Sequence, residues 1–352
     1  MEYYIRGIGN ISPQETLNSR DFPTELHNEN STILKCIHPD YKDYIDISSR
    51  RRMGNVVKMG IASALISLKD AGIENPGAII TCTGLGAVED TEKFLNSMLD
   101  NNEQFLNPAV FIQTTYNTIS SLIAIRLNCK NYNSTYVHRS FSFETGLIDA
   151  LMLIDENEAE NVLLGGVDDI TLTHFTLFDK LDYWKKSPIN QVNLLDSKSI
   201  GTIAGEGSTF FTITNQEHPE NYCRIKGVFT LFSSDIELVI KKFNSFLQTK
   251  DISLNNIDLI MLGLNGDSNF DDRYFSFMKV LNINTPMAVY KHLSGDYYTS
   301  SAFATALSAL AIYKDEVPDY MMYKSEKPKS IKNILIYNQF RGNEHSFILL
   351  GK

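Results

Sequence analysis

The sequence of 352 residues has few cysteines, a single tryptophan and no excess of positive charge. Its four cysteines are far apart and form no Cys-x-x-Cys pair, which argues against a disulfide framework and against a structural zinc site. A formal net charge of −10 argues against nucleic acid or an anionic membrane as the main partner. The run Arg50-Arg51-Arg52 is either a local basic patch or the solvated start of a helix. No metal ion is expected.

Long apolar runs and a targeting segment are also lacking. No stretch is apolar over the length that spans a bilayer, and the first residues do not show a basic segment followed by an apolar one. Gly7-Ile8-Gly9 ends a β-prone segment, but no glycine-rich helix start comes after it, so it is not a dinucleotide-binding fingerprint. The sequence therefore predicts a cytoplasmic protein with reduced thiols and no bound cofactor.

What the chain does have is an ordinary globular composition, with 43% hydrophobic and 21% charged residues. A chain of this length can bury a large core, either as one domain or as two fused similar halves. A helix is predicted between Ile45 and Gly72, where apolar residues share one face and Ala71-Gly72 ends the pattern. Strands and helices alternate with glycines in both halves of the sequence, which favours two stacked βαβαβ units.

The chain is organised around the stretch from Thr135 to Ala150 and the strand that follows it. β-prone residues open this stretch, and apolar residues then recur at near-helical spacing until a short apolar run ends at Gly165-Gly166. The pattern predicts a strand, a tight turn, a helix and a second strand. The unpaired N–H groups of such a helix point at the turn, which holds Ser140 and Ser142. A nucleophile in the turn would have its anion stabilised there.

This stretch resembles the nucleophile elbow of the β-ketoacyl-acyl-carrier-protein synthases, the condensing enzymes of the thiolase fold. That family has a cysteine at the strand-to-helix turn, then a helix, then a strand that ends in Gly-Gly. Counting back 25 positions from Gly165 without gaps places Ser140 at the cysteine position. The resemblance covers essentially the whole chain, and it implies an α/β fold, the thiolase-like five-layer αβαβα arrangement with two pseudo-equivalent halves.

The two halves are expected to be residues 1–215 and 216–352, because Gly205-Glu-Gly-Ser is similar to the family's Gly-Glu-Gly-Ala at the end of the first half. In the family, the segment that corresponds to Asn107 to Asn117 lies at the dimer interface and lines the acyl tunnel. The candidate substrate-binding residues on this segment are Val110, Phe111, Ile112 and Tyr116. Ordinary core packing is the open alternative for these four side chains.

The second half resembles the family at three further motifs. Asn265-Gly266 is similar to the start of the family's His-Gly-Thr-x-Thr, with asparagine at the histidine position. Lys291 and Gly295 match the family's Lys-x-x-x-Gly-His, with Asp296 at the histidine position. Phe340 is in register with the family's terminal Gly-Phe-Gly-Gly-Thr-Asn loop. The family's catalytic Cys-His-His set has therefore become Ser140, Asn265 and Asp296, and Lys291 and Phe340 are the other expected site residues.

These substitutions weaken condensation for physical reasons. A cysteine is readily shifted to thiolate by a helix N-terminus, whereas serine needs an adjacent general base, and His138 is the only nearby candidate on the same strand face. The family's two histidines donate hydrogen bonds to the thioester carbonyl, and Asn265 could still donate one. Asp296, if ionised at about 4 Å from the enolate, would oppose it by roughly 4 kcal/mol at an effective dielectric of 20. Ordinary condensation is therefore not expected.

Three functional hypotheses stay open. The first is a subunit similar to the chain-length factors, which lack the cysteine, pair with an active ketosynthase and shape its tunnel. The second is an enzyme that keeps acyl transfer or malonyl decarboxylation on acyl-carrier-protein substrates through Ser140. The third is a serine hydrolase on an unrelated fold, which the absence of Gly-x-Ser-x-Gly disfavours. Short segments also resemble ketosynthase-like proteins of bacterial aryl-polyene and flexirubin-type pigment clusters, within fatty-acid or polyketide-type biosynthesis.

The resemblance also implies an oligomer. Thiolase-fold proteins pair through the edge strand just before the elbow, here about Ser134 to His138, because an unpaired strand edge is an association hazard. A homodimer satisfies that strand as well as a heterodimer with an active ketosynthase does. The missing catalytic residues favour the heterodimer, and an acyl carrier protein is the expected further partner.

Overall fold

The computed structural model describes residues 1–17 and 20–352, and in them one ten-stranded sheet is built from two five-stranded halves with the same strand order. The first half holds β1 (Tyr4–Ile11), β4 (Ala78–Thr83), β5 (Tyr132–Val137), β6 (Asn161–Asp168) and β9 (Gly207–Thr214). The second half holds β10 (Cys223–Phe232), β11 (Leu259–Leu262), β12 (Met287–Val289), β13 (Asn333–Phe340) and β14 (Glu344–Gly351). Counted along the chain, each half runs in the order third, second, fourth, fifth, first strand.

The two halves touch edge to edge through their first strands. β1 and β10 pair antiparallel over only Tyr4↔Arg224 and Ile5↔Cys223, so the sheet divides on either side of this short contact. The chain crosses from one half to the other between β9 and β10. We propose residues 1–215 and 216–352 as the two halves, since each contains one complete copy of the repeated strand order.

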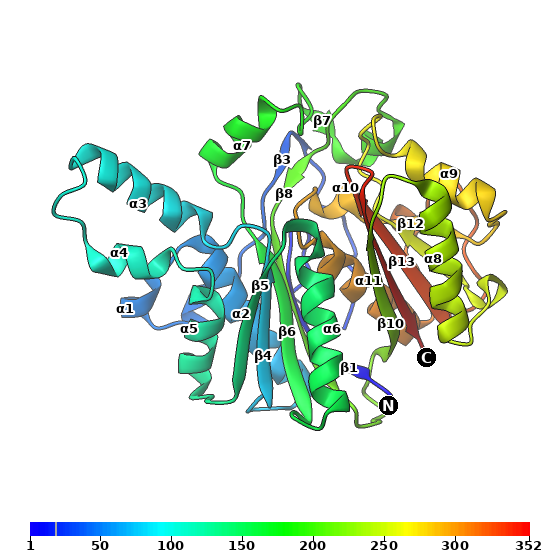
Figure 1. Cartoon of the computed structure of the whole chain (residues 1–352), viewed down its shortest axis with the longest axis horizontal. Helices are drawn as coiled ribbons and strands as arrows, with labels where there is room; N and C mark the ends of the chain where they lie inside the picture. Colours follow the sequence, from blue (N-terminus) through cyan, green and yellow to red (C-terminus); the bar gives the residue numbers. More distant parts are fainter. Residues whose placement is uncertain (18–19) are drawn as a thin grey trace.

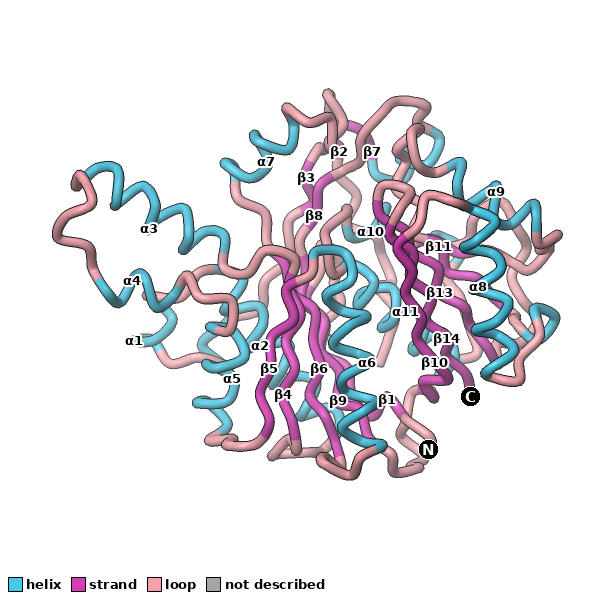
Figure 2. Tube along the Cα trace, viewed as in Figure 1, coloured by secondary structure: helices cyan, strands magenta, loops and turns pink. Residues whose placement is uncertain are grey.

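Helices fill the spaces between and outside the two halves of the sheet, as Figures 1 and 2 show. The helices α6 (Ser142–Asp155) and α11 (Ser300–Lys314) lie between the halves and contact strands of both. The first half is covered on its outer face by α2 (Asn55–Ala71) and α5 (Thr118–Leu127), and the second by α8 (Ile236–Thr249) and α9 (Asp272–Val280). Three clusters of buried apolar side chains pack these layers against one another. The expected five-layer αβαβα arrangement is confirmed.

The helix α2 illustrates how the sequence sets this packing. Its buried face lies so close to β1 that a Cβ atom at Gly9 would be 1.9 Å from the carbonyl oxygen of Ser63. Only glycine permits that approach. The helix ends where the pattern predicts, because Gly72 adopts a left-handed φ of 69° and donates its N–H to the last turn.

Smaller elements surround the layers. In the first half, α3 (Val88–Asp100) and α4 (Pro108–Gln113) form an arm that projects from the body at the left of Figure 1, next to the short α1 (Ile47–Arg50). The others are α7 (Leu172–Asp179), α10 (Lys291–Ser294), and the two-stranded pairs β2 (Asn30–Ser31) with β7 (Ile189–Asn190) and β3 (Ile33–Leu34) with β8 (Ala204–Gly205). No helix in the described part of the chain has the length and apolar character needed to cross a membrane.

Candidate functional site

The predicted elbow is present, and Ser140 lies in it. The strand β5 ends at Val137, Arg139 adopts a left-handed φ of 50°, and a short 3₁₀ turn leads into α6 at Ser142. Ser142 fixes the turn, because its Oγ accepts a hydrogen bond from the His138 N–H at 2.8 Å and donates to the Thr83 carbonyl at 2.8 Å. Ser140 is therefore held at the N-terminal end of a helix, where the dipole favours negative charge, and only 4% of its surface is exposed.

The hydrogen-bond partner of Ser140 is a carboxylate that the sequence did not indicate. The Ser140 hydroxyl donates to Glu344 Oε2, and Glu344 is the first residue of β14 in the other half of the molecule. His138, the base considered from the sequence, is in the wrong place. Its exposed ring stacks on Phe141 at 5.7 Å because the chain leaves the extended conformation at Arg139. Sequence neighbours cannot reveal the Glu344 contact, since 204 residues separate it from Ser140.

The two positions where the family has histidines are joined to each other. The Asn265 amide donates to Asp296 Oδ2 at 2.7 Å, and Lys291 Nζ lies 2.9 Å from Asp296 Oδ1. The Lys291 side chain is 2% exposed, so this is a buried ion pair. One N–H of the Asn265 amide bonds Asp296, so donation from its second N–H to a thioester carbonyl stays a prediction.

The ion pair also changes the electrostatic argument made from the sequence. The figure of roughly 4 kcal/mol assumed an isolated Asp296 charge, whereas Lys291 balances that charge at contact distance. The repulsion between Asp296 and an enolate is therefore weaker than expected. The absence of histidine N–H donors still applies, because Asp296 carries no N–H and one of the two Asn265 amide hydrogens bonds Asp296.

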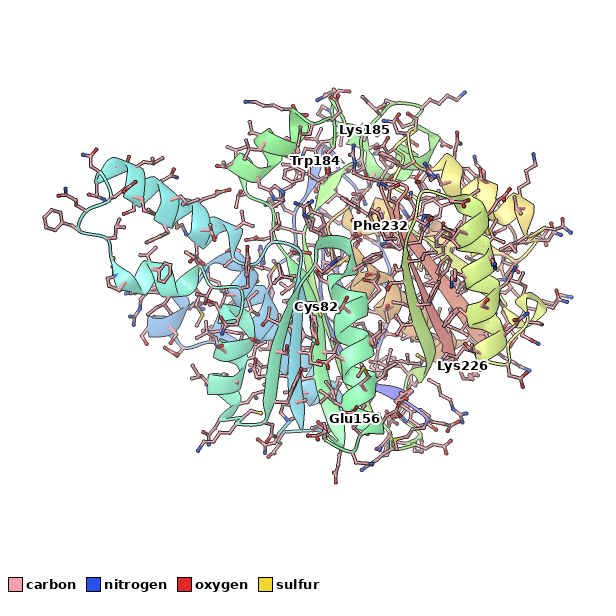
Figure 3. The ribbon with its side chains drawn as sticks, in the orientation of Figure 1. Cys82, Glu156, Trp184, Lys185, Lys226 and Phe232 are labelled. Carbon is pink, nitrogen blue, oxygen red and sulfur yellow. The ribbon has the colours of Figure 1, made fainter. Side chains whose placement is uncertain are left out.

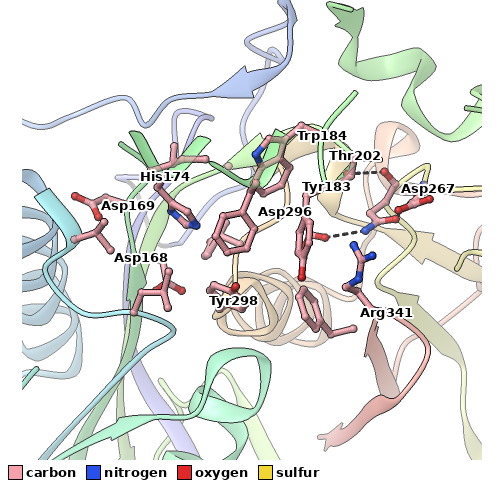
Figure 4. Close-up of a pocket in the computed structure, with 18 of the residues that line it drawn as sticks. Asp168, Asp169, His174, Tyr183, Trp184, Thr202, Asp267, Asp296, Tyr298 and Arg341 are labelled. Atoms are coloured by element: carbon pink, nitrogen blue, oxygen red, sulfur yellow. Dashed lines mark hydrogen bonds between the residues drawn. The ribbon is translucent and has the colours of Figure 1, made fainter. Parts of the chain in front are cut away.

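A cleft lies beside these residues and holds about 750 Å³ of empty space, including its opening to solvent. Asn265, Asp296 and Phe340 line it, as Figure 4 shows for Asp296. Its walls are largely aromatic, with contributions from Phe178, Tyr183, Trp184, Tyr298 and Phe340. The Tyr298 and Phe340 rings lie 5.5 Å apart. Ser140 and Glu344 are not among the described residues that line the cleft.

Tyr298 lies between the cleft and the elbow. Its ring is packed so closely on Gly84 that a Cβ atom there would be 2.2 Å from it, and the residue before Gly84 is Thr83, which accepts the Ser142 hydrogen bond. Tyr298 also lines the cleft. Tyr298 therefore contacts both the cleft and the end of β4 to which the elbow is hydrogen-bonded.

Two polar side chains at the cleft were missed from the sequence. Burial and the nearby Glu206 carboxylate raise the pKa of Asp169 to about 8, so this carboxyl is largely protonated at neutral pH, and its Oδ1 has no hydrogen-bond partner. Burial lowers the pKa of His174, and neither of its ring nitrogens has a partner. The acidic pair after the Gly165-Gly166 strand is a sequence signal for a polar strand end. His174 carries no such signal, because only the position of α7 brings it to the cleft.

Asp168, the other carboxyl of the pair, links neighbouring segments through hydrogen bonds. It accepts hydrogen bonds from the Gly84 N–H at 2.7 Å, the Thr83 hydroxyl at 3.0 Å, and the N–H and hydroxyl of Thr299 at 2.9 and 2.8 Å. These bonds connect the ends of β4 and β6 to the start of α11. Asp168 therefore fixes the end of β4, and Ser142 of the elbow is hydrogen-bonded to the same end.

The candidate tunnel residues lie on the projecting arm and are exposed in the single chain. Phe111, Ile112 and Tyr116 are 54%, 64% and 57% exposed, and Val110 is half-buried. Tyr116 packs against Gly86, which lines the cleft, and the role of these four side chains in binding an acyl chain stays a prediction. The strand β5 is an edge of the sheet, as expected. Further large apolar side chains are exposed on the elements around it, among them Leu99, Phe105, Ile125 and Met152.

Comparison with known proteins identifies the family. Residues 7–218, more than half of the chain, match the family described as "Beta-ketoacyl synthase, N-terminal domain". The chain belongs to the β-ketoacyl synthase family. This membership rules out the hypothesis of a serine hydrolase on an unrelated fold. No curated protein matches the sequence.

Solved structures with the same fold match the chain over its whole length. The ishigamide ketosynthase/chain length factor has a TM-score of 0.82 at 15% identity, with 100% of this chain and 99% of that chain covered. A β-ketoacyl synthase from Burkholderia phymatum STM815 has a TM-score of 0.82 at 12% identity, with 100% and 99% covered. The ketosynthase ApeO in complex with its chain length factor ApeC, from Xenorhabdus doucetiae, has a TM-score of 0.75 at 15% identity, with 99% and 98% covered.

Proposed function

We propose that this protein is a non-condensing member of the β-ketoacyl synthase family that acts as a chain-length-factor-like subunit. Its partner is an active ketosynthase, and the pair extends acyl chains on an acyl carrier protein in fatty-acid or polyketide-type biosynthesis. The observation that carries this proposal is the buried group formed by Asn265, Asp296 and Lys291. Where a condensing enzyme presents two histidine donors to the substrate, this chain presents groups that bond one another.

The exposed apolar face supports the second part of the proposal. The β5 edge, the arm and the outer side of α6 carry large apolar side chains that no other part of the described chain covers. Contiguous exposed apolar surface next to an open strand edge is typical of an interface. The ishigamide ketosynthase/chain length factor and the complex of ApeO with its chain length factor ApeC share this fold. A cytoplasmic location fits such a subunit.

Malonyl decarboxylation by this chain is the less favoured alternative. Decarboxylation generates an enolate that needs hydrogen-bond donors in place, and in place of two histidines this chain has Asp296, which carries no N–H, and Asn265, one of whose two amide hydrogens bonds Asp296. Acyl transfer alone forms no enolate.

The experiment is co-purification. The protein is co-expressed with a ketosynthase from the same genomic neighbourhood, purified through a tag on one chain, and weighed by native mass spectrometry. The proposal predicts one copy of each chain in a stable complex, and a longer or shorter product when Phe111 is changed to Ala. A stable monomer under these conditions, together with an unchanged product length, would contradict it.

A further inference from the structure

We propose that the cleft beside α7 binds a planar aromatic carboxylic acid that carries a hydroxyl group, with the hydroxyl at His174 and the carboxylate at Arg341. The ligand is a free acid held by non-covalent contacts between the aromatic walls. This inference goes beyond the proposed subunit role and does not depend on it. The two polar residues that carry it are neither those at the family's catalytic positions nor those on the exposed arm.

The walls of the cleft favour a flat aromatic ligand. Neighbouring rings contact one another around it, with the centroids of Phe178 and Tyr183 at 4.7 Å. Those of Tyr183 and Phe340 are 6.3 Å apart, and the Phe340 ring in turn contacts Tyr298. Ring faces and edges of this kind pack well against a further aromatic ring. The empty space of about 750 Å³, including the opening, lies within the range of about 300–1,000 Å³ that is usual for small-molecule sites.

His174 brings two unsatisfied hydrogen-bonding atoms to the cleft. Its ring packs edge-on against Phe178 at 4.4 Å, and both ring nitrogens are shielded from solvent and have no partner in the described chain. Burial lowers the pKa of this imidazole, so at neutral pH one nitrogen donates and the other accepts. Buried polar atoms without partners are costly. A ligand hydroxyl, which both donates and accepts, would satisfy one of these nitrogens.

Asp169 is a second unsatisfied group, and Figure 4 draws it on the same side of the cleft as His174. The residue is 8% exposed, and its Oδ1 is buried without a hydrogen-bond partner. Its pKa of about 8 keeps the carboxyl largely protonated at neutral pH. A protonated carboxyl can donate a hydrogen bond, and it does not repel an acidic ligand as a carboxylate would.

Arg341 is the only lysine or arginine among the described residues that line the cleft. Its guanidinium lies over the Tyr183 ring at 4.1 Å and the Phe270 ring at 4.9 Å, and it has no ion pair within the described chain. Stacking on ring faces leaves the N–H edge of the guanidinium free, and that edge matches a carboxylate through two parallel hydrogen bonds. Figure 4 draws His174 to one side of Tyr183 and Tyr298 and Arg341 to the other, so the two polar contacts lie at opposite ends of the ligand.

The acidic residues of the cleft argue against an organic cation as the ligand, although aromatic walls with free carboxylates are typical of such a site. Asp168 accepts four hydrogen bonds, and Asp296 is paired with Lys291. Asp169 is largely protonated. The fourth, Asp267, accepts a backbone N–H of its own loop at 3.0 Å. These carboxyl groups are occupied or neutral, whereas the edge of the guanidinium is free.

The single tryptophan of the chain makes the test specific to this cleft. Trp184 is 7% exposed and lines the cleft, so quenching of tryptophan fluorescence reports a ligand at this wall. The probe is 6-hydroxy-2-naphthoic acid, which is planar and carries its hydroxyl and carboxylate at opposite ends. Isothermal titration calorimetry with the full chain measures the affinity. We expect saturable binding with a Kd below about 1 mM, and quenching of Trp184 with the same midpoint.

Two related probes separate the polar contacts, since 2-naphthoic acid lacks the hydroxyl and 6-hydroxy-2-naphthamide lacks the charge. His174→Phe keeps a flat ring but removes both nitrogens, and it should weaken the hydroxylated acid at least about fivefold while leaving 2-naphthoic acid within about twofold. Arg341→Gln should weaken both acids at least about tenfold and leave the amide within about twofold. Arg126→Gln is the matched control, because Arg126 is exposed on α5 and does not line the cleft. Its affinities should equal those of the unaltered protein.

Three results would overturn the proposal. The first is no saturable binding of 6-hydroxy-2-naphthoic acid, or binding that leaves Trp184 fluorescence unchanged. The second is equal affinity in the unaltered protein, His174→Phe and Arg341→Gln, with circular dichroism showing each variant to be folded, because the acid would then make an apolar contact only. The third is tighter binding of benzyltrimethylammonium than of the acid, which would make the cleft a cation site. None of these results changes the outcome of co-purification with a ketosynthase, so the proposed function is tested separately.

Discussion

At the scale of single residues, the site differs from a condensing centre because its polar groups bond one another. Ser140 bonds Glu344, and Asn265 bonds Asp296, which pairs with Lys291. Each substitution alone would lower condensation, and together they remove the thiolate and both histidine donors. The serine, asparagine and aspartate were predicted from sequence position. Their partners could not be predicted, since the contacts join segments far apart in the chain.

Restoring the cysteine alone is not expected to restore condensation. In Ser140→Cys the thiol gains the helix end that favours a thiolate, but the enolate still lacks histidine donors and Asn265 still bonds Asp296. Mass spectrometry of reactions with acyl- and malonyl-loaded carrier protein should show no β-keto product from this variant. Product formation within tenfold of an ordinary ketosynthase would show that the donors are not limiting.

Breaking the buried ion pair is expected to destabilise the fold. Asp296→Asn leaves the Lys291 ammonium, with a side chain 2% exposed, without its counter-charge, which costs about 3–5 kcal/mol in the free energy of unfolding. Urea unfolding measures the loss. The matched control is Lys327→Met, which removes an exposed pair with Asp319 and costs about 0.5 kcal/mol or less. Equal losses of unfolding free energy in the two variants would mean that the Lys291–Asp296 pair is exposed to solvent.

The stability of the protein should depend on pH through Asp169. Burial, together with Glu206, Asp168 and Glu89, raises its pKa from 3.8 to about 8, and Lys35 opposes this only weakly. A carboxyl whose pKa is higher in the folded than in the unfolded state stabilises the fold at low pH, and this contribution is lost as the pH rises from about 4 to about 8. The free energy of unfolding should therefore fall between pH 5 and pH 8, and it should fall less in the Asp169→Asn variant. Parallel pH profiles for the two proteins would contradict the raised pKa.

At the scale of elements, the periodic helices were predicted well and the irregular turns were not. The apolar pattern between Ile45 and Gly72 predicts a helix that ends at Ala71-Gly72, and α2 covers Asn55–Ala71. The elbow was predicted as a tight turn that holds Ser140 and Ser142, and this turn is present, but the left-handed φ of Arg139 within it was not predicted. The period at which apolar residues recur in the sequence identifies long regular elements. The conformation of a turn depends instead on tertiary hydrogen bonds such as those of Ser142.

The arm and β5 should carry the subunit contact. Ile112→Asp places a charge on an apolar side chain of α4 that is 64% exposed, and it is expected to weaken assembly with the ketosynthase at least about tenfold, because charge is disfavoured in a desolvated interface. The control is Phe232→Asp on β10, which is 69% exposed and is drawn far from α4 in Figure 3. Analytical ultracentrifugation measures assembly with the ketosynthase for both variants. Equal weakening by the two variants would argue against the arm as the contact.

At the scale of the whole molecule, the repeated strand order organises the site. Ser140 comes from the first half, and Glu344, Asn265 and Asp296 come from the second, so the site forms only where the halves meet. The family resemblance predicted this fold because six short motifs occur in the right order along the chain. The cleft-lining His174 and the aromatic walls could not be predicted, since they depend on how segments of both halves fold over the sheet ends.

The most direct test of the central claim is to remove each nucleophile in turn from the purified complex with the ketosynthase and measure the β-keto product by mass spectrometry. If this chain is the non-condensing subunit, Ser140→Ala leaves product formation within about twofold of the unaltered complex, and replacing the ketosynthase's cysteine with alanine abolishes it. Loss of product in Ser140→Ala, with product still formed when the partner's cysteine is removed, would show that this chain is the condensing enzyme.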